Sequence, residues 1–152
     1  MKEFIRNYKQ KGLIKEEEIG FDQIIKHLTR ATKDLKVAEA NLKIDSEAAY
    51  TYAYLAMLRA GRGLMFSFGL RPIDGEQHKT VVQFCEHVLG DKFSETVDYF
   101  DLMRKKRNRF TYDEPGLLVS ESEISSALAN ACKLVRAVYD FIQEKNLQQK
   151  LI

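Results

Sequence analysis

The densest group of residues that could do chemistry is a basic segment near the middle of the C-terminal half, from Arg104 to Asp113. Five of the six residues from 104 to 109 are basic, in a chain whose formal net charge is only +2. A local cluster of this kind attracts phosphate or another anion. It also has structural explanations, because cations at a helix C-terminus complement the helix dipole and Asp101 is spaced to pair with basic residues three and four positions later.

Arg107 differs from its basic neighbours because it falls on the apolar side of its helix, seven residues after Phe100 and four after Met103. A guanidinium keeps its charge, so one on this side needs a partner. The partner is either a carboxylate of a neighbouring helix or a phosphate, which arginine binds in a bidentate way. With Asn108 beside it, Arg107 is the best site candidate in the sequence.

Other types of active site find no support in the sequence. The three histidines, His27, His78 and His87, have neither the Glu-x-x-His pairs of a di-iron bundle nor the spacing of zinc ligands. We therefore expect no metal and no cofactor. Gly61 and Gly63 do not form a phosphate-binding loop, because they lie inside a helical pattern where close helix packing explains them. His78 and His87 would reach Arg107 only by folding close, and nothing in the sequence places them there.

The elements that must position this segment are helices. Apolar residues recur at steps of three and four along most of the chain, and no strand signal competes with this pattern. Asp45 is predicted to cap the second long helix, and Ser120 with Glu123 forms a capping box at the start of the last one. The pattern predicts an all-α, up-and-down bundle of four main helices plus one short helix. The expected helical stripes lie within residues 21–42, 47–68, 81–89, 93–110 and 124–142.

Composition sets the limits of this interpretation. The 152 residues suit one domain with one hydrophobic core, and 24 Lys plus Arg against 22 Asp plus Glu exclude a chain that is basic all over. Two cysteines are too few for a disulfide scaffold, and we expect both to be reduced core residues. The first 20 residues lack the apolar core of a secretory signal, and no stretch is long enough to span a bilayer. These features predict a cytoplasmic protein that does not contact membranes.

Three segments are expected. Residues 1–20 form an N-terminal arm, either a short helix packed on the bundle or a mobile segment. Residues 21–146 form the helical bundle, and residues 147–152 form a C-terminal tail.

The order of the helices, and above all Arg107-Asn108 followed by Tyr112 near the end of the penultimate long helix, resembles the HEPN domain family. Residues 31–42, the second helix rich in Ala and Tyr, and Gln77-His78-Lys79 at the start of the third support the resemblance, which covers roughly residues 21–146. It implies a HEPN-like bundle that dimerises along the helices that carry the motif. In that family an Arg-Asn pair, followed five residues after the Arg by a His, forms a composite cleft that binds and often cleaves RNA.

The resemblance places Arg107, Asn108 and Tyr112 at the catalytic positions, with Tyr112 where the family has its histidine. A histidine with a pKa near about 6.5 exchanges protons at neutral pH, whereas a tyrosine near about 10 is almost fully protonated there. The phosphate-binding half of the site is therefore retained and the proton-transfer half is impaired. The surrounding positive field is expected from four further residues: Arg104, Lys105, Lys106 and Arg109.

Three hypotheses follow for the function. The first is a HEPN-like protein that binds RNA or nucleotide phosphate in the cleft of a homodimer, with weak metal-independent endoribonuclease activity, as in toxin–antitoxin or RNA-processing systems. The second is a non-catalytic partner- or substrate-binding helical module paired with a nucleotidyltransferase, in which Arg107 and Tyr112 are interface residues. The third is a structural network in which a buried carboxylate pairs with Arg107 and no ligand binds.

Overall fold

The central element of the molecule is α3 (Ser46–Ser67), and the other long helices pack around it. The structure is a computed structural model, and it describes residues 1–73, 77–114, 116 and 119–150, with side chains up to residue 146. The remaining elements, in chain order, are α1 (Lys2–Gln10), β1 (Ile14–Glu16), α2 (Phe21–Ala40), β2 (Leu70–Pro72), α4 (Gln77–Leu89), η1 (Asp91–Phe93), α5 (Ser94–Asn108), η2 (Arg109–Asp113) and α6 (Glu121–Lys150).

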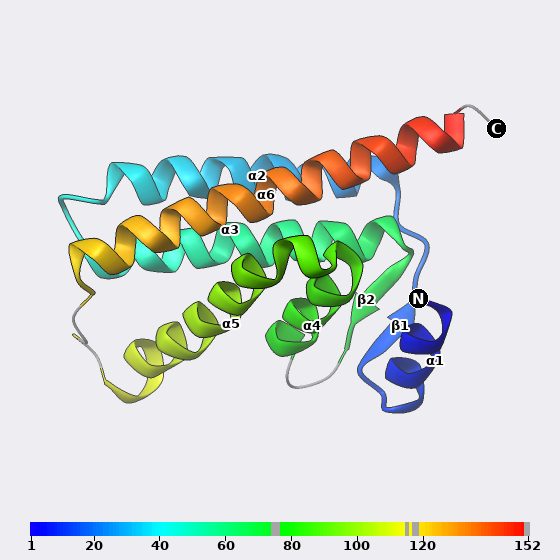
Figure 1. Cartoon of the computed structure of the whole chain (residues 1–152), viewed down its shortest axis with the longest axis horizontal. Helices are drawn as coiled ribbons and strands as arrows, with labels where there is room; N and C mark the ends of the chain where they lie inside the picture. Colours follow the sequence, from blue (N-terminus) through cyan, green and yellow to red (C-terminus); the bar gives the residue numbers. More distant parts are fainter. Residues whose placement is uncertain (74–76, 115, 117–118, 151–152) are drawn as a thin grey trace.

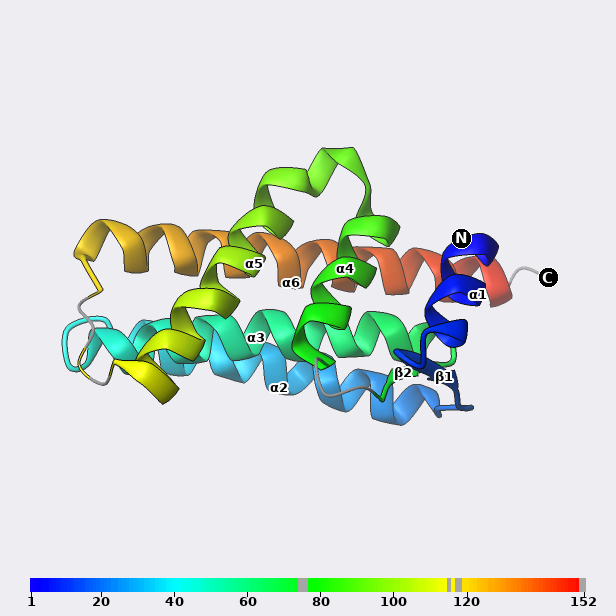
Figure 2. The same ribbon diagram turned by 90° about the horizontal axis from the view of Figure 1, so that it is seen from below.

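The long helices are arranged in two groups. Helices α2, α3 and α6 run lengthwise beside one another, while α4 and α5 lie against them at an angle (Figures 1 and 2). Helix α3 contacts α2, α6, α4 and α5, which explains why it is apolar nearly all round. The predicted all-α bundle is confirmed, and α5, which holds most of the basic segment, lies on its outside.

Close packing between α3 and α4 depends on Gly61. A Cβ atom at this position would lie 2.5 Å from Cγ1 of Val81 and 3.0 Å from Sγ of Cys85, both on α4. The two helices therefore approach closely only because Gly61 has no side chain. This contact agrees with the packing role predicted for the glycine, and it places Val81 and Cys85 of α4 against α3.

Local capping interactions begin two helices where the sequence predicts them. The Asp45 carboxylate accepts a hydrogen bond from the Ala48 amide (3.1 Å) at the start of α3. At the start of α6, the Ser120 hydroxyl accepts from the Glu123 amide (3.0 Å), and the Glu123 carboxylate accepts from the Ser120 amide (3.3 Å). The predicted N-cap and capping box are both confirmed, and the second fixes Glu123 opposite α5.

A buried ion pair joins α2 to α3. Asp34 on α2 is fully buried, and its carboxylate pairs with Arg59 on α3 and, at 3.1 Å, with Nε of Arg30 one turn away. A buried carboxylate without such partners would strongly destabilise the fold. Charge pairing, in addition to apolar contact, therefore fixes how α2 lies on α3.

The structure also differs from the sequence-based prediction. A short antiparallel strand pair joins β1 to β2, with Lys15 opposite Arg71, and it ties the N-terminal segment to the end of α3. Three-residue strands are too short to show an alternating pattern, so the sequence did not reveal them. Cys132 is exposed on α6 rather than buried, and only Cys85 lies in the core. Helix α6 is assigned as far as Lys150, within the segment expected as a tail.

Among the residues that the structure describes, no helix is both long and apolar enough to cross a membrane.

Candidate phosphate-binding site at the end of helix α5

Arg107 lies in the last turn of α5 and is half-buried, as its place on the apolar stripe predicts. Its Nε atom is buried and has no hydrogen-bond partner, and no carboxylate among the described residues pairs with it. The guanidinium carbon lies 6.0 Å from the centre of the Tyr112 ring. The buried carboxylate of the third hypothesis is therefore not found in the described part of the chain, and none of the described residues supplies a counter-ion for Arg107.

The other basic residues of the segment already have acidic partners. Asp101 accepts a hydrogen bond from Nε of Arg104 (2.9 Å) and lies 3.1 Å from Nζ of Lys105. Although burial opposes it, these two contacts hold the pKa of Asp101 below its usual value. Arg109, the first residue of the π-helical turn η2, pairs with Glu114 (3.1 Å) just after that turn, and both side chains are largely exposed.

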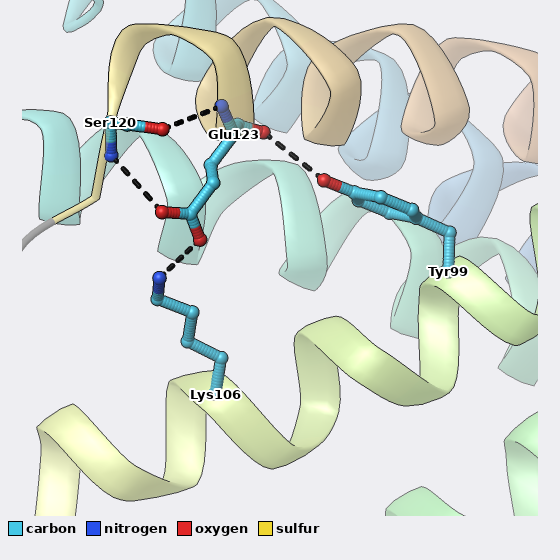
Figure 3. A network of polar contacts seen from close by, with 4 residues as sticks. All are labelled: Tyr99, Lys106, Ser120 and Glu123. Carbon is cyan, nitrogen blue, oxygen red and sulfur yellow. Dashed lines mark hydrogen bonds and ion pairs between the residues drawn. The ribbon is translucent and has the colours of Figure 1, made fainter.

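Lys106 points away from this group and toward α6. Its ammonium pairs with the Glu123 carboxylate of the capping box, and Tyr99 donates to the Glu123 carbonyl (3.3 Å) in the same network (Figure 3). The hydrogen bond from Lys106 lowers the pKa of Glu123. Lys106 therefore helps to dock α5 on α6, and its charge is directed into the fold rather than to a ligand.

Asn108 and Tyr112 lie on either side of the junction between α5 and η2. Asn108 is the last residue of α5 and is half-buried, while the Tyr112 side chain is 73% exposed. The continuation of α5 into η2 brings the Tyr112 ring back beside Arg107. The three residues predicted from the motif are thus neighbours at one end of α5, with Tyr112 on the outside.

The charge of Arg107 acts on two residues outside the motif, His78 on α4 and Tyr54 on α3. Nδ1 of His78, in the first turn of α4, lies 2.8 Å from the hydroxyl of Tyr54 on α3. Tyr54 is completely buried, so its hydroxyl needs this partner. His78 therefore joins the start of α4 to α3, a contact that its sequence pattern did not predict.

The charges of three arginines act on the Tyr54–His78 pair. Burial lowers the pKa of His78, and the positive charges of Arg62, Arg107 and Arg104, in that order, lower it further. Burial raises the pKa of Tyr54, and the same arginines oppose that rise. Both groups therefore experience a concentrated positive field inside one chain.

Arg62 is the second member of this group that the sequence analysis missed. One of its terminal nitrogens donates to the side-chain oxygen of Gln77 (3.0 Å), while its Nε atom is buried without a partner. Burial lowers the pKa of Arg62, and the nearby charge of Arg71 adds to the effect. Arg62 follows Tyr54 by eight residues, so both lie on one face of α3. This spacing was the signal available in the sequence. It identifies Arg62 as a candidate site residue only when the packing of α4 against α3 is known.

The arrangement suits an anion. Arg62 and Arg107 each carry a buried Nε–H without an acceptor among the described residues, and the charges of both arginines and of Asp101 act on the Tyr54 hydroxyl. Guanidinium groups bind phosphate through two parallel hydrogen bonds, which makes phosphate a fitting anion here. The described residues contain no group of three or more His, Cys, Asp or Glu side chains placed to hold a metal ion.

Residues 25–145 match the family model of the HEPN domain, and the chain therefore belongs to the HEPN domain family. The match confirms the resemblance that the Arg107-Asn108 motif and the helix order suggested. HEPN domains are helical modules of RNA-related or nucleotide-binding proteins, and they often form dimers. No curated protein matches the chain.

Proposed function

We propose that this HEPN domain binds the phosphate groups of RNA or of a nucleotide at the end of α5, with Arg107 and Asn108 in direct contact. The observation that carries the proposal is the Arg107 guanidinium, which pairs with no carboxylate among the described residues and whose buried Nε–H has no acceptor there, while its basic neighbours engage carboxylates. A half-buried cation of this kind gains most from an anionic ligand, because the ligand supplies a counter-charge that the described residues do not.

The four flanking basic residues contribute unequally in this proposal. Arg104, Lys105 and Arg109 are close to the site and strengthen the positive field, although each shares its charge with a carboxylate. Lys106 contributes least, because its ammonium is bound to Glu123 on α6. The cleft is completed by a second copy of the chain, in keeping with the frequent dimerisation of HEPN domains.

Cleavage of RNA is the catalytic form of the proposal. The 2′-oxygen would bond to the adjacent phosphorus as its proton passes to water, and the bond from phosphorus to the 5′-oxygen of the next nucleotide would break. The products are a 2′,3′-cyclic phosphate and a 5′-hydroxyl that takes a proton from water. No metal ion takes part, and Arg107 would stabilise the charge that develops on the phosphate oxygens. Tyr112 lies beside Arg107 and is well placed to donate a hydrogen bond, but a tyrosine is a poor base at neutral pH. We therefore expect slow cleavage.

The test compares the wild-type chain with Arg107→Ala, using labelled single-stranded RNA in the presence of a chelator. Arg136→Ala is the matched control, because Arg136 is an exposed arginine on α6 that pairs with Asp140. We expect the Arg107 variant to lose RNA binding and any cleavage, while the Arg136 variant retains both. Equal binding by all three proteins would rule out the proposed site.

A second proposal is that this end of α5 binds a protein partner such as a nucleotidyltransferase. It is favoured by the exposure of two large side chains there, Leu102 (55%) and Tyr112 (73%). Tyrosine and arginine are common at the energetic centres of interfaces. RNA binding that ignores Arg107→Ala, together with loss of a partner on Tyr112→Ala, is the result that would favour this alternative.

A further inference from the structure

We infer that the outer face of α1 is a second phosphate-binding surface, so that single-stranded RNA held at the end of α5 extends along one side of the molecule to α1. Lys2, Arg6 and Lys9 form this α1 basic face. The inference rests on the proposed function and adds to it the course that the RNA takes. Helix α1 lies before residues 25–145, the part of the chain that matches the HEPN family model.

The first argument is the concentration of charge in α1. Residues 2–11 contain four basic residues and one acidic residue, so this short segment has a formal charge of +3 in a chain whose formal net charge is only +2. The acidic residue, Glu3, lies in the first turn, where it complements the helix dipole. Positive charge is therefore gathered at one place on a nearly neutral chain, and a local field of this kind attracts a polyanion.

The second argument is that the apolar side of α1 is already covered. The Phe4 ring stacks on the rings of His87 on α4 (4.4 Å between ring centres) and of Tyr8 (4.1 Å). The Tyr8 hydroxyl donates to the side-chain oxygen of Gln83, also on α4 (2.7 Å). A basic amphipathic helix that binds a membrane inserts its apolar side among the lipids. Here that side packs on α4 and only the basic side is open, which favours RNA over a membrane.

The third argument is the shape and the pairing of the α1 basic face. Its three side chains follow one another at steps of four and three residues, and together they line a surface pocket of about 400 Å³. The Glu16 carboxylate of β1 also lines this pocket, where it binds the ammonium group of Lys9. Lys2 and Arg6 are exposed, and neither pairs with a carboxylate among the described residues. A phosphate group in the pocket would have both cations as partners.

The fourth argument is the position of α1 relative to the end of α5. Helices α5, α4 and α1 lie on the same side of α3, in this order along it (Figures 1 and 2). The Phe110 ring, just after α5, packs on Tyr50 near the start of α3, whereas the β1–β2 pair ties α1 to the end of α3. At 1.5 Å per residue, α3 covers roughly 25 Å from Tyr50 to Ser67. The two surfaces therefore lie toward opposite ends of α3 on one side of the molecule.

Two phosphate sites on one chain act together on one strand. Once the end of α5 holds a phosphate, the rest of the strand stays close to α1, so the second contact forms at a high effective concentration. Stacked nucleotides are about 3.4 Å apart, so a strand of about 15 nucleotides is longer than α3, whereas a dinucleotide is far shorter. The contribution of α1 to RNA affinity must therefore depend on the length of the strand.

The first test measures affinity and its salt dependence with oligouridylates of about 2 and 15 nucleotides, for the wild type and the double variant Lys2→Gln/Arg6→Gln. We expect the variant to bind the longer RNA roughly tenfold more weakly, with a slope of log affinity against log salt concentration smaller by about 1.4, which corresponds to two phosphate contacts. Its affinity for the dinucleotide should equal that of the wild type. The control, Lys33→Gln/Lys36→Gln, removes two exposed charges from α2, on the other side of α3, and should bind both RNAs as the wild type does (Figure 1).

Arg107→Ala, measured in the same way, separates this inference from the function on which it rests. If Arg107→Ala weakens the binding of both RNAs while the α1 variant binds the longer RNA as the wild type does, the inference is wrong and the proposed function stands. If only the α1 variant weakens binding, the proposed function fails, and with it the course of RNA from α5 to α1. Vesicles of phosphatidylserine and phosphatidylcholine test the membrane. Vesicle binding that the α1 variant loses, without a change in its RNA affinity, would overturn the inference.

The second test needs no substitution and so does not depend on whether a variant folds. The backbone NMR signals of the wild-type chain are recorded with each of the two oligouridylates. We expect the longer RNA to shift the signals of both α1 and the end of α5, and the dinucleotide to shift those of α5 alone. Signals of α1 that stay unchanged when the longer RNA saturates the chain would overturn the inference.

Discussion

At the scale of single residues, the direction of each side chain in the basic segment decides its role. Lys106 is directed to α6 and binds Glu123, whereas Arg107, one position later, lies beside the Tyr112 ring. A step of one residue on a helix turns a side chain by about a quarter of a circle or slightly more, so neighbours in the sequence serve different surfaces. The count of basic residues therefore overstates the charge available to a ligand.

Replacement of Arg107 by Ala should change the stability of the fold only slightly. No carboxylate among the described residues depends on Arg107, so none is left buried and unpaired. Chemical unfolding should show a loss well below the roughly 3–5 kcal/mol expected for a broken buried ion pair. A loss of that full size would point to a structural role for Arg107.

Arg59→Ala, in contrast to Arg107→Ala, should clearly lower the stability of the fold. Arg59 lies on the same helix as Arg62. The substitution leaves the fully buried Asp34 with Arg30 as its remaining partner. We expect a loss of about 2–3 kcal/mol in the same unfolding experiment, somewhat less than for a completely unpaired carboxylate. A change of less than about 0.5 kcal/mol, typical of a surface substitution, would contradict this account of Asp34.

His78 should make the folded state sensitive to acid. Its pKa in the folded protein is lowered from the usual value of 6.5, mainly by burial. The unfolded chain therefore binds a proton first as the pH falls, and the contribution of neutral His78 to stability is complete above about pH 6.5 and declines below it. Urea unfolding at about pH 7.5 and 5.5 should show a smaller acid loss for His78→Gln than for the wild type. Equal losses would indicate that His78 titrates normally.

The sequence predicted the motif residues but not their surroundings. Arg107 could be recognised because a cation on an apolar stripe is visible in the spacing to Phe100 and Met103. Arg62 and His78 lie 45 and 29 positions before it, and their contacts depend on how α3 and α4 pack. Periodicity shows which face of a helix is buried, but not which face of another helix it meets.

At the scale of elements, the α3–α4 contact positions His78, and two glycines on α3 test it. Gly61→Ala should destabilise the protein, because the new methyl group would lie 2.5 Å from Val81 Cγ1 and force α4 away. Gly63→Ala is the control, since its nearest neighbours lie at an ordinary 3.6 Å and alanine favours the helix by up to about 1 kcal/mol. Thermal unfolding should separate the two, and equal melting temperatures would contradict the packing argument.

Helix boundaries were predictable where side chains cap the backbone locally, as with Asp45 and the Ser120–Glu123 box. The β1–β2 pair was not predictable. Its paired residues are separated by more than 50 positions in the sequence, and each strand is only three residues long. Hydrogen bonding between distant short segments has no counterpart in local periodicity. The N-terminal helix α1 is tied to the bundle through this pair.

At the scale of the whole molecule, we expect the chain to form a homodimer through the outer face of α5. Leu102 is 55% exposed there, although it is a large apolar residue. Leu102→Glu should dissociate the dimer, as measured by light scattering or sedimentation, because it would bury two like charges across a symmetric interface. Ile25→Glu is the control on α2, which lies on the other side of α3 (Figure 1). A Leu102 variant that remains dimeric would place the interface elsewhere.

The charge of the whole chain limits how RNA can bind. A formal net charge of +2 gives little general attraction for nucleic acid, so affinity must come from a few local contacts. Each contact with a phosphate of single-stranded RNA contributes about 0.7 to the slope of log affinity against log salt concentration. The slope therefore counts the contacts that the proposed site makes.

The most direct test of the central claim is this salt slope, measured with oligouridylate for the wild type and Arg107→Ala. If Arg107 holds a phosphate, the variant should bind more weakly and its slope should be smaller by about 0.7 or slightly more. Arg136→Ala should keep the wild-type slope, since Arg136 is an exposed residue of α6 that pairs with Asp140. A wild-type affinity that does not respond to salt, or a slope that Arg107→Ala leaves unchanged, would contradict the account.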